Sequence, residues 1–196
     1  MVNSAGIMDN GRNCQCWSTG PFLSKNSSTT EPCNVIVLGA GAAGLMCALT
    51  AARRGRQVVV LEKSNKIGKK ILMSGGGRCN FTNTSIASEN FLCANPHFCK
   101  SALTRYTQWD FIKMVEQHGI EYEEPKHQQL FCKDSAQQIL AMLRSECEQA
   151  GVTIKTHCEI NSITSLLPTD QAPDDKQNSP YKIAFSQSKN KEIHQH

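Results

Sequence analysis

The chain has 196 residues, of which 39% are hydrophobic and 19% are charged, so it carries enough apolar material for a packed core and is not a wholly disordered chain. Its formal net charge of +4 is too small a surplus to indicate a nucleic-acid-binding surface. The 10 cysteines are scattered among apolar segments, and we read no signal peptide before them. This pattern indicates reduced thiols in a cytoplasmic protein and excludes a small secreted disulfide scaffold.

The first residues of the chain show no sign of a regular element. Residues 1–32 mix Ser, Thr, Asn and Gly with few large apolar groups and follow neither a helical nor a strand period, so we expect a disordered leader. Residues 35–52 carry no charge and approach the length that spans a bilayer. Their β-branched start and glycine-rich turn favour a buried strand, a turn and a helix instead, so we expect no membrane span.

The segment after the leader predicts a βαβ unit. Residues 35–38 and 57–61 are β-branched runs typical of buried strands, and residues 42–54 between them are rich in Ala, Leu and Met. Gly55 stands where a helix would end. Two strands joined by a helix in this way lie parallel in one sheet.

The second half of the chain predicts two more helices and three more strands. Residues 107–118 open with a capping-box pattern, and residues 135–149 carry apolar side chains along one helical face. Residues 152–156 are predicted to add a strand to the parallel sheet. The segments 160–166 and 181–185 are predicted to form a small antiparallel layer.

The sharpest functional pattern lies in the turn of the βαβ unit. Gly39, Gly41 and Gly44 form a GxGxxG pattern, in which the glycines permit a tight turn, close approach of a pyrophosphate and close packing of the helix. The start of the helix offers free N–H groups to the phosphates. Glu62 ends the second strand, where a carboxylate accepts hydrogen bonds from the adenosine ribose. The pattern therefore predicts an adenine-dinucleotide site.

A second glycine-rich loop follows this unit. Gly75, Gly76 and Gly77 can free consecutive N–H groups for an anion-binding nest, and Arg78 adds a bidentate donor. A flexible loop with a charged tip explains the same residues equally well. Cys79 beside Arg78 raises the question of a redox thiol, but it has no CxxC partner in the sequence. We therefore favour an inert thiol.

Several motifs recur in an order that resembles a known family. They are Val35-Ile36-Val37-Leu38-Gly39-Ala40-Gly41-Ala42-Ala43-Gly44, Glu62-Lys63, Gly68-Lys69-Lys70 and Ser74-Gly75-Gly76-Gly77-Arg78-Cys79-Asn80-Phe81-Thr82-Asn83. In this order they resemble the BaiN/YhiN (HI0933-like) NAD(P)/FAD-dependent oxidoreductases. The resemblance covers about residues 33–186, and its most specific part is the Gly-Gly-Gly-Arg-Cys-Asn segment.

The resemblance implies a flavoprotein that binds FAD and transfers a hydride between NAD(P)H, as electron donor, and a small-molecule organic substrate. The residues that it places at the cofactor are Gly39, Ala40, Gly41, Ala42, Ala43, Gly44, Glu62, Lys63, Lys70, Gly75, Gly76, Gly77, Arg78, Cys79 and Asn80. None of these side chains stands out as a catalytic acid or base. We find no histidine or cysteine group with the spacing of metal ligands, so no metal site is expected.

The expected fold class is α/β, a Rossmann-type FAD/NAD(P)-binding domain with a small antiparallel β layer. We divide the chain into a leader, a partial FAD-binding domain, the start of the antiparallel layer and a polar tail, over residues 1–32, 33–158, 159–187 and 188–196. Members of the family continue well beyond this length, so the chain is expected to be an N-terminal portion.

The parallel sheet is expected to be incomplete. Of the doubly wound order 3-2-1-4-5, the chain has candidates for strands 3, 2 and 1 only, so residues 35–38 become an open edge that favours self-association. Neither nucleic acid nor a membrane is an expected partner. Two other functions stay open at this point: an NAD-dependent dehydrogenase with the same glycine pattern, and a truncated, non-catalytic nucleotide-binding module.

Overall fold

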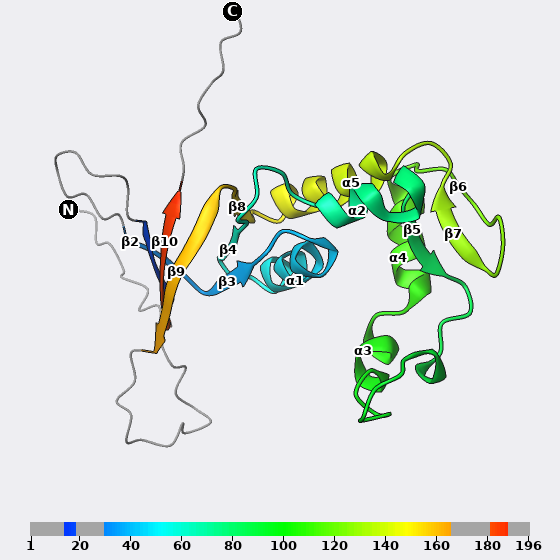
Figure 1. Ribbon diagram of the computed structural model, residues 1–196, viewed down its shortest axis with the longest axis horizontal. Helices are drawn as coiled ribbons and strands as arrows, with labels where there is room; N and C mark the ends of the chain where they lie inside the picture. Colours follow the sequence, from blue (N-terminus) through cyan, green and yellow to red (C-terminus); the bar gives the residue numbers. More distant parts are fainter. Residues whose placement is uncertain (1–13, 19–29, 166–180, 188–196) are drawn as a thin grey trace, which may run out of the picture.

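Three sheets follow one another along the molecule. The computed structural model describes residues 14–18, 30–165 and 181–187. A parallel sheet lies in the middle, a four-stranded sheet at one end and a small antiparallel sheet at the other (Figure 1). This arrangement sets a Rossmann-type unit between two smaller β layers.

The middle sheet is the parallel sheet predicted from the sequence. β3 (Val35–Leu38), β4 (Val58–Leu61) and β8 (Thr153–Lys155) are parallel and lie in the order β3-β4-β8. All residues of β4 are buried, as expected for the central strand. Among the described residues β3 pairs on one side only, and Leu38 at its end is 46% exposed. The predicted strand order and open edge are both confirmed.

Two long helices form the main core with this sheet. α1 (Ala42–Arg53) connects β3 to β4, and α5 (Ala136–Gln149) packs against α1 and precedes β8. Both predicted helices are therefore confirmed to within one residue at each end. Leu49 of α1 and Leu143 of α5 are buried in the same apolar cluster, where truncation of a leucine to alanine costs about 2–5 kcal/mol. None of the helices in the described part of the chain is both long and apolar enough to cross a membrane.

The strands of the small antiparallel sheet are not among the elements predicted from the sequence. β5 (Asn80–Asn83), β6 (Tyr122–Glu123) and β7 (Gln129–Cys132) lie in the order β5-β7-β6. These strands are only two to four residues long, so none shows enough of an alternating pattern to be recognised. Their pairing across distant parts of the chain supplies the stabilisation that local propensity lacks.

α4 (Gln108–Gln117) begins where the capping pattern predicts. The Asp110 amide donates to Thr107 Oγ at 3.3 Å, and the Thr107 amide donates to Asp110 Oδ2 at 2.7 Å. The two hydrogen bonds close a capping box. Before α4, α3 (Lys100–Arg105) and the 3-10 helix η2 (Ser88–Asn90) bury no residue.

The four-stranded sheet contains the predicted antiparallel layer and two further strands. β9 (Cys158–Ser165) and β10 (Tyr181–Gln187) are antiparallel, as expected. β1 (Cys14–Ser18) and β2 (Thr30–Cys33) complete the order β2-β1-β10-β9. β1 lies inside residues 1–32 and β2 begins there, so the expectation of a disordered leader is wrong for these strands. β1 pairs in parallel with β10, a partner far along the chain that no local pattern reveals.

Candidate dinucleotide-binding site

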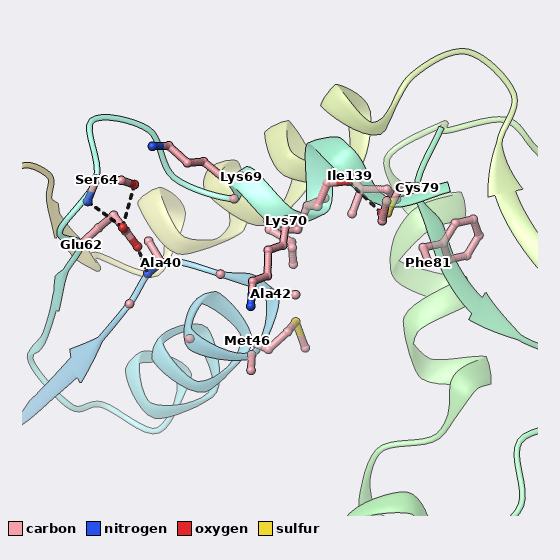
Figure 2. A pocket seen from close by; sticks show the side chains of 18 of the residues that line it. Ala40, Ala42, Met46, Glu62, Ser64, Lys69, Lys70, Cys79, Phe81 and Ile139 are labelled. Carbon is pink, nitrogen blue, oxygen red and sulfur yellow. Dashed lines mark hydrogen bonds between the residues drawn. The ribbon is translucent and has the colours of Figure 1, made fainter. Parts of the chain in front are cut away.

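A cavity of about 740 Å³ lies at the ends of β3 and β4, between α1, α2 (Lys69–Met73) and β5 (Figure 2). Ten of the residues that the sequence analysis assigned to a cofactor lie in its wall. They are Gly39, Ala40, Gly41, Ala42, Ala43, Gly44, Glu62, Lys70, Cys79 and Asn80. The structure therefore brings the glycine turn, the strand-end carboxylate and part of the second loop to one hollow.

The three glycines of the turn are under different constraints. Gly39 has φ +97°, in the region that favours glycine. A Cβ on Gly44 would lie 2.0 Å from the Gly39 carbonyl oxygen, so only a glycine lets α1 approach β3 this closely. A Cβ on Gly41 would meet nothing within 4 Å, because Gly41 faces the cavity. Gly44 is thus required by the fold, whereas Gly41 leaves room for a ligand.

The start of α1 has the properties of an anion site. Gly41 is its N-cap and provides no side-chain cap, and no acidic residue lies in its first turn. The first N–H groups of a helix have no partner within the helix and carry a partial positive charge. These groups lie in the cavity wall beside Ala42 and Ala43, so the helix is arranged to receive a phosphate.

Glu62 lies beside the turn that leads into this helix and is held by three protein donors. Its Oε2 accepts a hydrogen bond from the Ala40 amide at 2.7 Å, and its Oε1 accepts from the Ser64 amide at 2.8 Å and from Ser64 Oγ at 2.7 Å. Burial alone would raise the pKa of this carboxyl, but the hydrogen bonds from Ser64 and Ala40, with the charge of Lys69, lower it below its ordinary value. Glu62 therefore stays ionised at neutral pH.

α2 carries two lysines to the same region. The Gly68 amide donates to the Ala40 carbonyl oxygen at 2.8 Å, which fixes the start of α2 beside the glycine turn. Figure 2 shows the Lys70 side chain extending toward Ala42 at the start of α1, and the Lys69 side chain directed toward Ser64. Both lysines line the cavity, so positive charge surrounds the place where the helix start would hold a phosphate.

Five of the predicted cofactor residues lie outside the cavity wall: Lys63, Gly75, Gly76, Gly77 and Arg78. The Lys63 ammonium pairs with Glu159 at 2.8 Å. The Arg78 guanidinium pairs with Glu123 of β6 and lies 5.5 Å from the centre of the Phe131 ring. Both cations are therefore directed toward other parts of the protein surface.

The three glycines of the second loop lie outside the cavity wall, but they set the path of the chain that forms part of it. Its glycines belong to the 3-10 helix η1 (Ser74–Gly77), and all three have φ between +57° and +89°. The Arg78 and Cys79 amides donate to the Gly75 and Ser74 carbonyl oxygens at 3.3 and 3.0 Å. The loop thus folds back on itself and presents Cys79 and Asn80 to the cavity.

Sequence reasoning missed several residues of the wall. Ser64 is the clearest case, and its position two residues after Glu62 is the only signal that marks it. The wall also contains the apolar residues Met46, Phe81, Phe111, Ile139 and Leu143. Figure 2 shows Phe81 at the end away from Glu62 and Met46 beside Ala42. The Phe81 and Phe111 rings lie 6.0 Å apart. Sequence periodicity alone gives such residues the appearance of ordinary core.

No group of three or more His, Cys, Asp or Glu side chains that could hold a metal ion occurs in the residues that the structure describes. Cys79 is 5% exposed, and burial raises the pKa of its thiol, against a smaller opposing effect of a hydrogen bond with Ser74. It is therefore protonated at neutral pH, unlike an activated redox thiolate.

The comparisons with known proteins agree with one another on the family of this chain. The model described as HI0933-like protein Rossmann domain matches residues 33–184. The ribosomal RNA dihydrouridine synthase of Escherichia coli (strain K12) is 53% identical over 133 residues, which are 68% of this chain and 33% of that protein. The 3-dehydro-bile acid delta(4,6)-reductase of Clostridium scindens is 28% identical over 130 residues, or 65% of this chain and 32% of that protein.

A solved structure of a 3-ketosteroid-delta4-(5alpha)-dehydrogenase from Rhodococcus jostii RHA1 matches with a TM-score of 0.48 at 15% identity, over 79% of this chain and 44% of that chain. The chain spans about a third of the length of the curated relatives it matches. The family match contains the glycine turn, Glu62 and the second glycine loop, and it confirms the resemblance seen in the sequence.

Proposed function

Because the chain belongs to the HI0933-like protein Rossmann domain family, we propose that its cavity binds FAD and that it forms the cofactor-binding portion of a flavin-dependent oxidoreductase. One observation carries this proposal. Gly41 leaves open space at the uncapped start of α1, while the ionised Glu62 lies at the end of the neighbouring strand. A phosphate and a ribose of an adenine dinucleotide need these two features side by side.

The pyrophosphate would lie against Gly41 and the first turn of α1. The backbone N–H groups there would donate to phosphate oxygens, and Lys70 would add a positive charge from the opposite wall. Gly75, Gly76 and Gly77 would act indirectly, by fixing the loop that presents Cys79 and Asn80. In this proposal Lys63 and Arg78 have no direct role, since each pairs with a carboxylate elsewhere.

The adenosine ribose would be held by Glu62. A carboxylate has about four lone-pair positions for hydrogen bonds, and Ala40 and Ser64 use three of them. The remaining position on Oε2 accepts one ribose hydroxyl. The negative charge disfavours a 2′-phosphate at the same place, which favours FAD over a phosphorylated dinucleotide in this cavity.

The apolar end of the cavity is suited to the flavin side of the molecule. Phe81 and Phe111 present aromatic surfaces there, against which a flat ring can pack. Bound flavin would supply the hydride chemistry, with NAD(P)H as the proposed donor. The protein residues bind, orient and exclude water, and we assign none of them as a catalytic acid or base.

We propose uridine in ribosomal RNA as the substrate of the complete enzyme. The relative that bears this activity in its name is 53% identical to this chain over 133 residues, whereas the bile-acid reductase is 28% identical. The expectation that nucleic acid is no partner rested on the modest net charge of this portion alone. A substrate can be bound by parts of an enzyme that this chain does not contain, and the cytoplasmic location expected from the cysteines agrees with an RNA substrate.

The cofactor is tested by titrating the reduced protein with FAD and following flavin fluorescence. We expect saturable quenching, and added ADP should reverse it by displacing FAD, because the site recognises the ADP half of FAD. The alternative of an NAD-dependent dehydrogenase predicts tighter binding of NAD than of FAD. A module that binds neither dinucleotide would overturn the proposal.

The substrate is tested with a chimera in which residues 33–184 of this chain replace the matching segment of the Escherichia coli relative. In cells that lack the native enzyme, the chimera should restore dihydrouridine in ribosomal RNA. The same chimera with Gly41→Val is the control, and it should restore none. A folded chimera that contains FAD yet produces no dihydrouridine would contradict the proposed substrate while leaving the cofactor site intact.

A further inference from the structure

Two cysteines from distant parts of the chain meet behind the cavity wall. Cys79 directly precedes β5, and Cys132 is the last residue of β7. In the antiparallel pairing of these strands Asn80 is opposite Phe131, which brings Cys79, the residue before Asn80, close to Cys132, the residue after Phe131. The Cys132 amide donates to the Arg78 carbonyl oxygen at 2.9 Å, which holds the two segments together at this point.

Both thiols face the interior. Cys79 is 5% exposed and Cys132 is fully buried, and both belong to the main apolar cluster. The carbonyl oxygen that accepts from the Cys132 amide belongs to Arg78, the residue before Cys79. A disulfide needs Cα atoms about 4.4–6.8 Å apart, and the two backbones approach each other at this point.

The electrostatic environment of Cys132 shows the same proximity. Burial raises the pKa of its thiol to about 11, and a charge on Cys79 is the next largest contribution in the same direction. Cys79 also lines the cavity, so it is the cysteine of the pair that a small molecule in the cavity meets. Its φ of +56° is uncommon for a residue with a side chain, and this conformation places Cys79 at the corner between the cavity and β7.

We propose that Cys79 and Cys132 form a redox modification site, at which a peroxide that enters the cavity oxidises the two thiols to an intrachain disulfide. The Cys79 sulfur attacks one peroxide oxygen, the O–O bond breaks, and a sulfenic acid and water form. The Cys132 sulfur then attacks the Cys79 sulfur, the S–O bond breaks, and a second water leaves. Two thiols and one hydrogen peroxide thus give one disulfide and two waters.

The site is expected to react slowly at neutral pH. The attacking species is the thiolate, and burial raises the pKa of Cys79. As long as the pH stays below that pKa, the rate should therefore increase about tenfold for each unit by which the pH is raised. This slow reaction agrees with a thiol that stays reduced in the cytoplasm and responds to sustained oxidation.

The experiment is peptide mapping of the full chain after reduction, exposure to hydrogen peroxide and alkylation of the remaining thiols. We expect a linked peptide pair that contains Cys79 and Cys132, and its loss in both Cys79→Ser and Cys132→Ser. Cys147→Ser is the matched control, because Cys147 is buried in the same cluster and its thiol donates to the Leu45 carbonyl oxygen at 3.4 Å. Absence of the linked pair at peroxide doses that oxidise the exposed Cys93 would overturn the proposal, as would a link from Cys79 to another cysteine in place of Cys132.

A second experiment rests on the proposed function, the binding of FAD in the cavity. If FAD fills the cavity, it covers Cys79, so a saturating concentration of FAD should slow formation of the disulfide at least fivefold. Gly41→Val, which should prevent FAD binding, should abolish this protection. A disulfide that forms equally fast with and without FAD would contradict FAD binding in this cavity, while the disulfide site itself would stand.

Discussion

The close contact between α1 and β3 makes Gly44→Ala a direct test of the turn. The added Cβ would lie 2.0 Å from the Gly39 carbonyl oxygen and 3.4 Å from Val37 Cγ1, whereas real Cβ contacts stay above 3.0 Å. The start of α1 must therefore move away from β3 by about 1 Å, since the obstacle is backbone and not the end of a flexible side chain. Overpacking of this kind costs about 1–3 kcal/mol, occasionally more, and a clash with a carbonyl belongs at the upper end.

A loss of about 3 kcal/mol lowers the thermal midpoint of a chain of this size by about 6–12 °C. Far-ultraviolet circular dichroism during heating measures this shift. Gly41→Ser is the matched control, because Gly41 has φ −83° and ψ −176°, has nothing within 4 Å of its Cβ position, and is the N-cap of α1, where serine is favoured. A wild-type midpoint in Gly44→Ala, or an equal loss in Gly41→Ser, would refute the distinction drawn between the two glycines.

Three further predictions concern Glu62 and the open edge. Glu62→Ala should weaken FAD binding by about 1.5–3 kcal/mol through loss of hydrogen bonds to a charged acceptor, and an unchanged titration curve would remove Glu62 from the site. Because the pKa of Glu62 is lowered in the folded protein, its stabilisation is present above the ordinary pKa of a glutamate and is lost as the pH falls through the lower pKa of the folded state. The acid unfolding curves of wild type and Glu62→Gln should therefore converge at low pH, and parallel curves down to the lowest pH would contradict this. The exposed edge of β3 should make the isolated chain sediment as an oligomer, and a monodisperse monomer would contradict this.

The parts of the fold that follow from the sequence are those with a strong local pattern. The β-branched runs of β3 and β4 and the glycines between them predict the βαβ unit, since each signal lies within a few residues of the element it specifies. The cap at Thr107 is equally local, and the structure shows both of its hydrogen bonds.

The parts that the sequence did not reveal depend on partners far along the chain. β1 pairs with β10, although most of the chain lies between them in the sequence. The short strands β5 and β7 have too few residues to show a period. The same reason explains why Arg78 was assigned to the cofactor, since its carboxylate partner Glu123 is 45 residues away. Cys79 lacked a partner in the sequence for the same reason, because Cys132 becomes its neighbour only through strand pairing.

The measurement that tests the central claim most directly is an FAD titration of the wild-type chain and Gly41→Val, with circular dichroism to verify that both are folded. The branched side chain would fill the space in front of α1 where a pyrophosphate must lie, and no protein atom lies within 4 Å of its Cβ position. Our account predicts saturable flavin quenching in the wild type and none in the folded variant. Equal binding by the two proteins would contradict it, because it would show that the dinucleotide does not lie on the glycine turn.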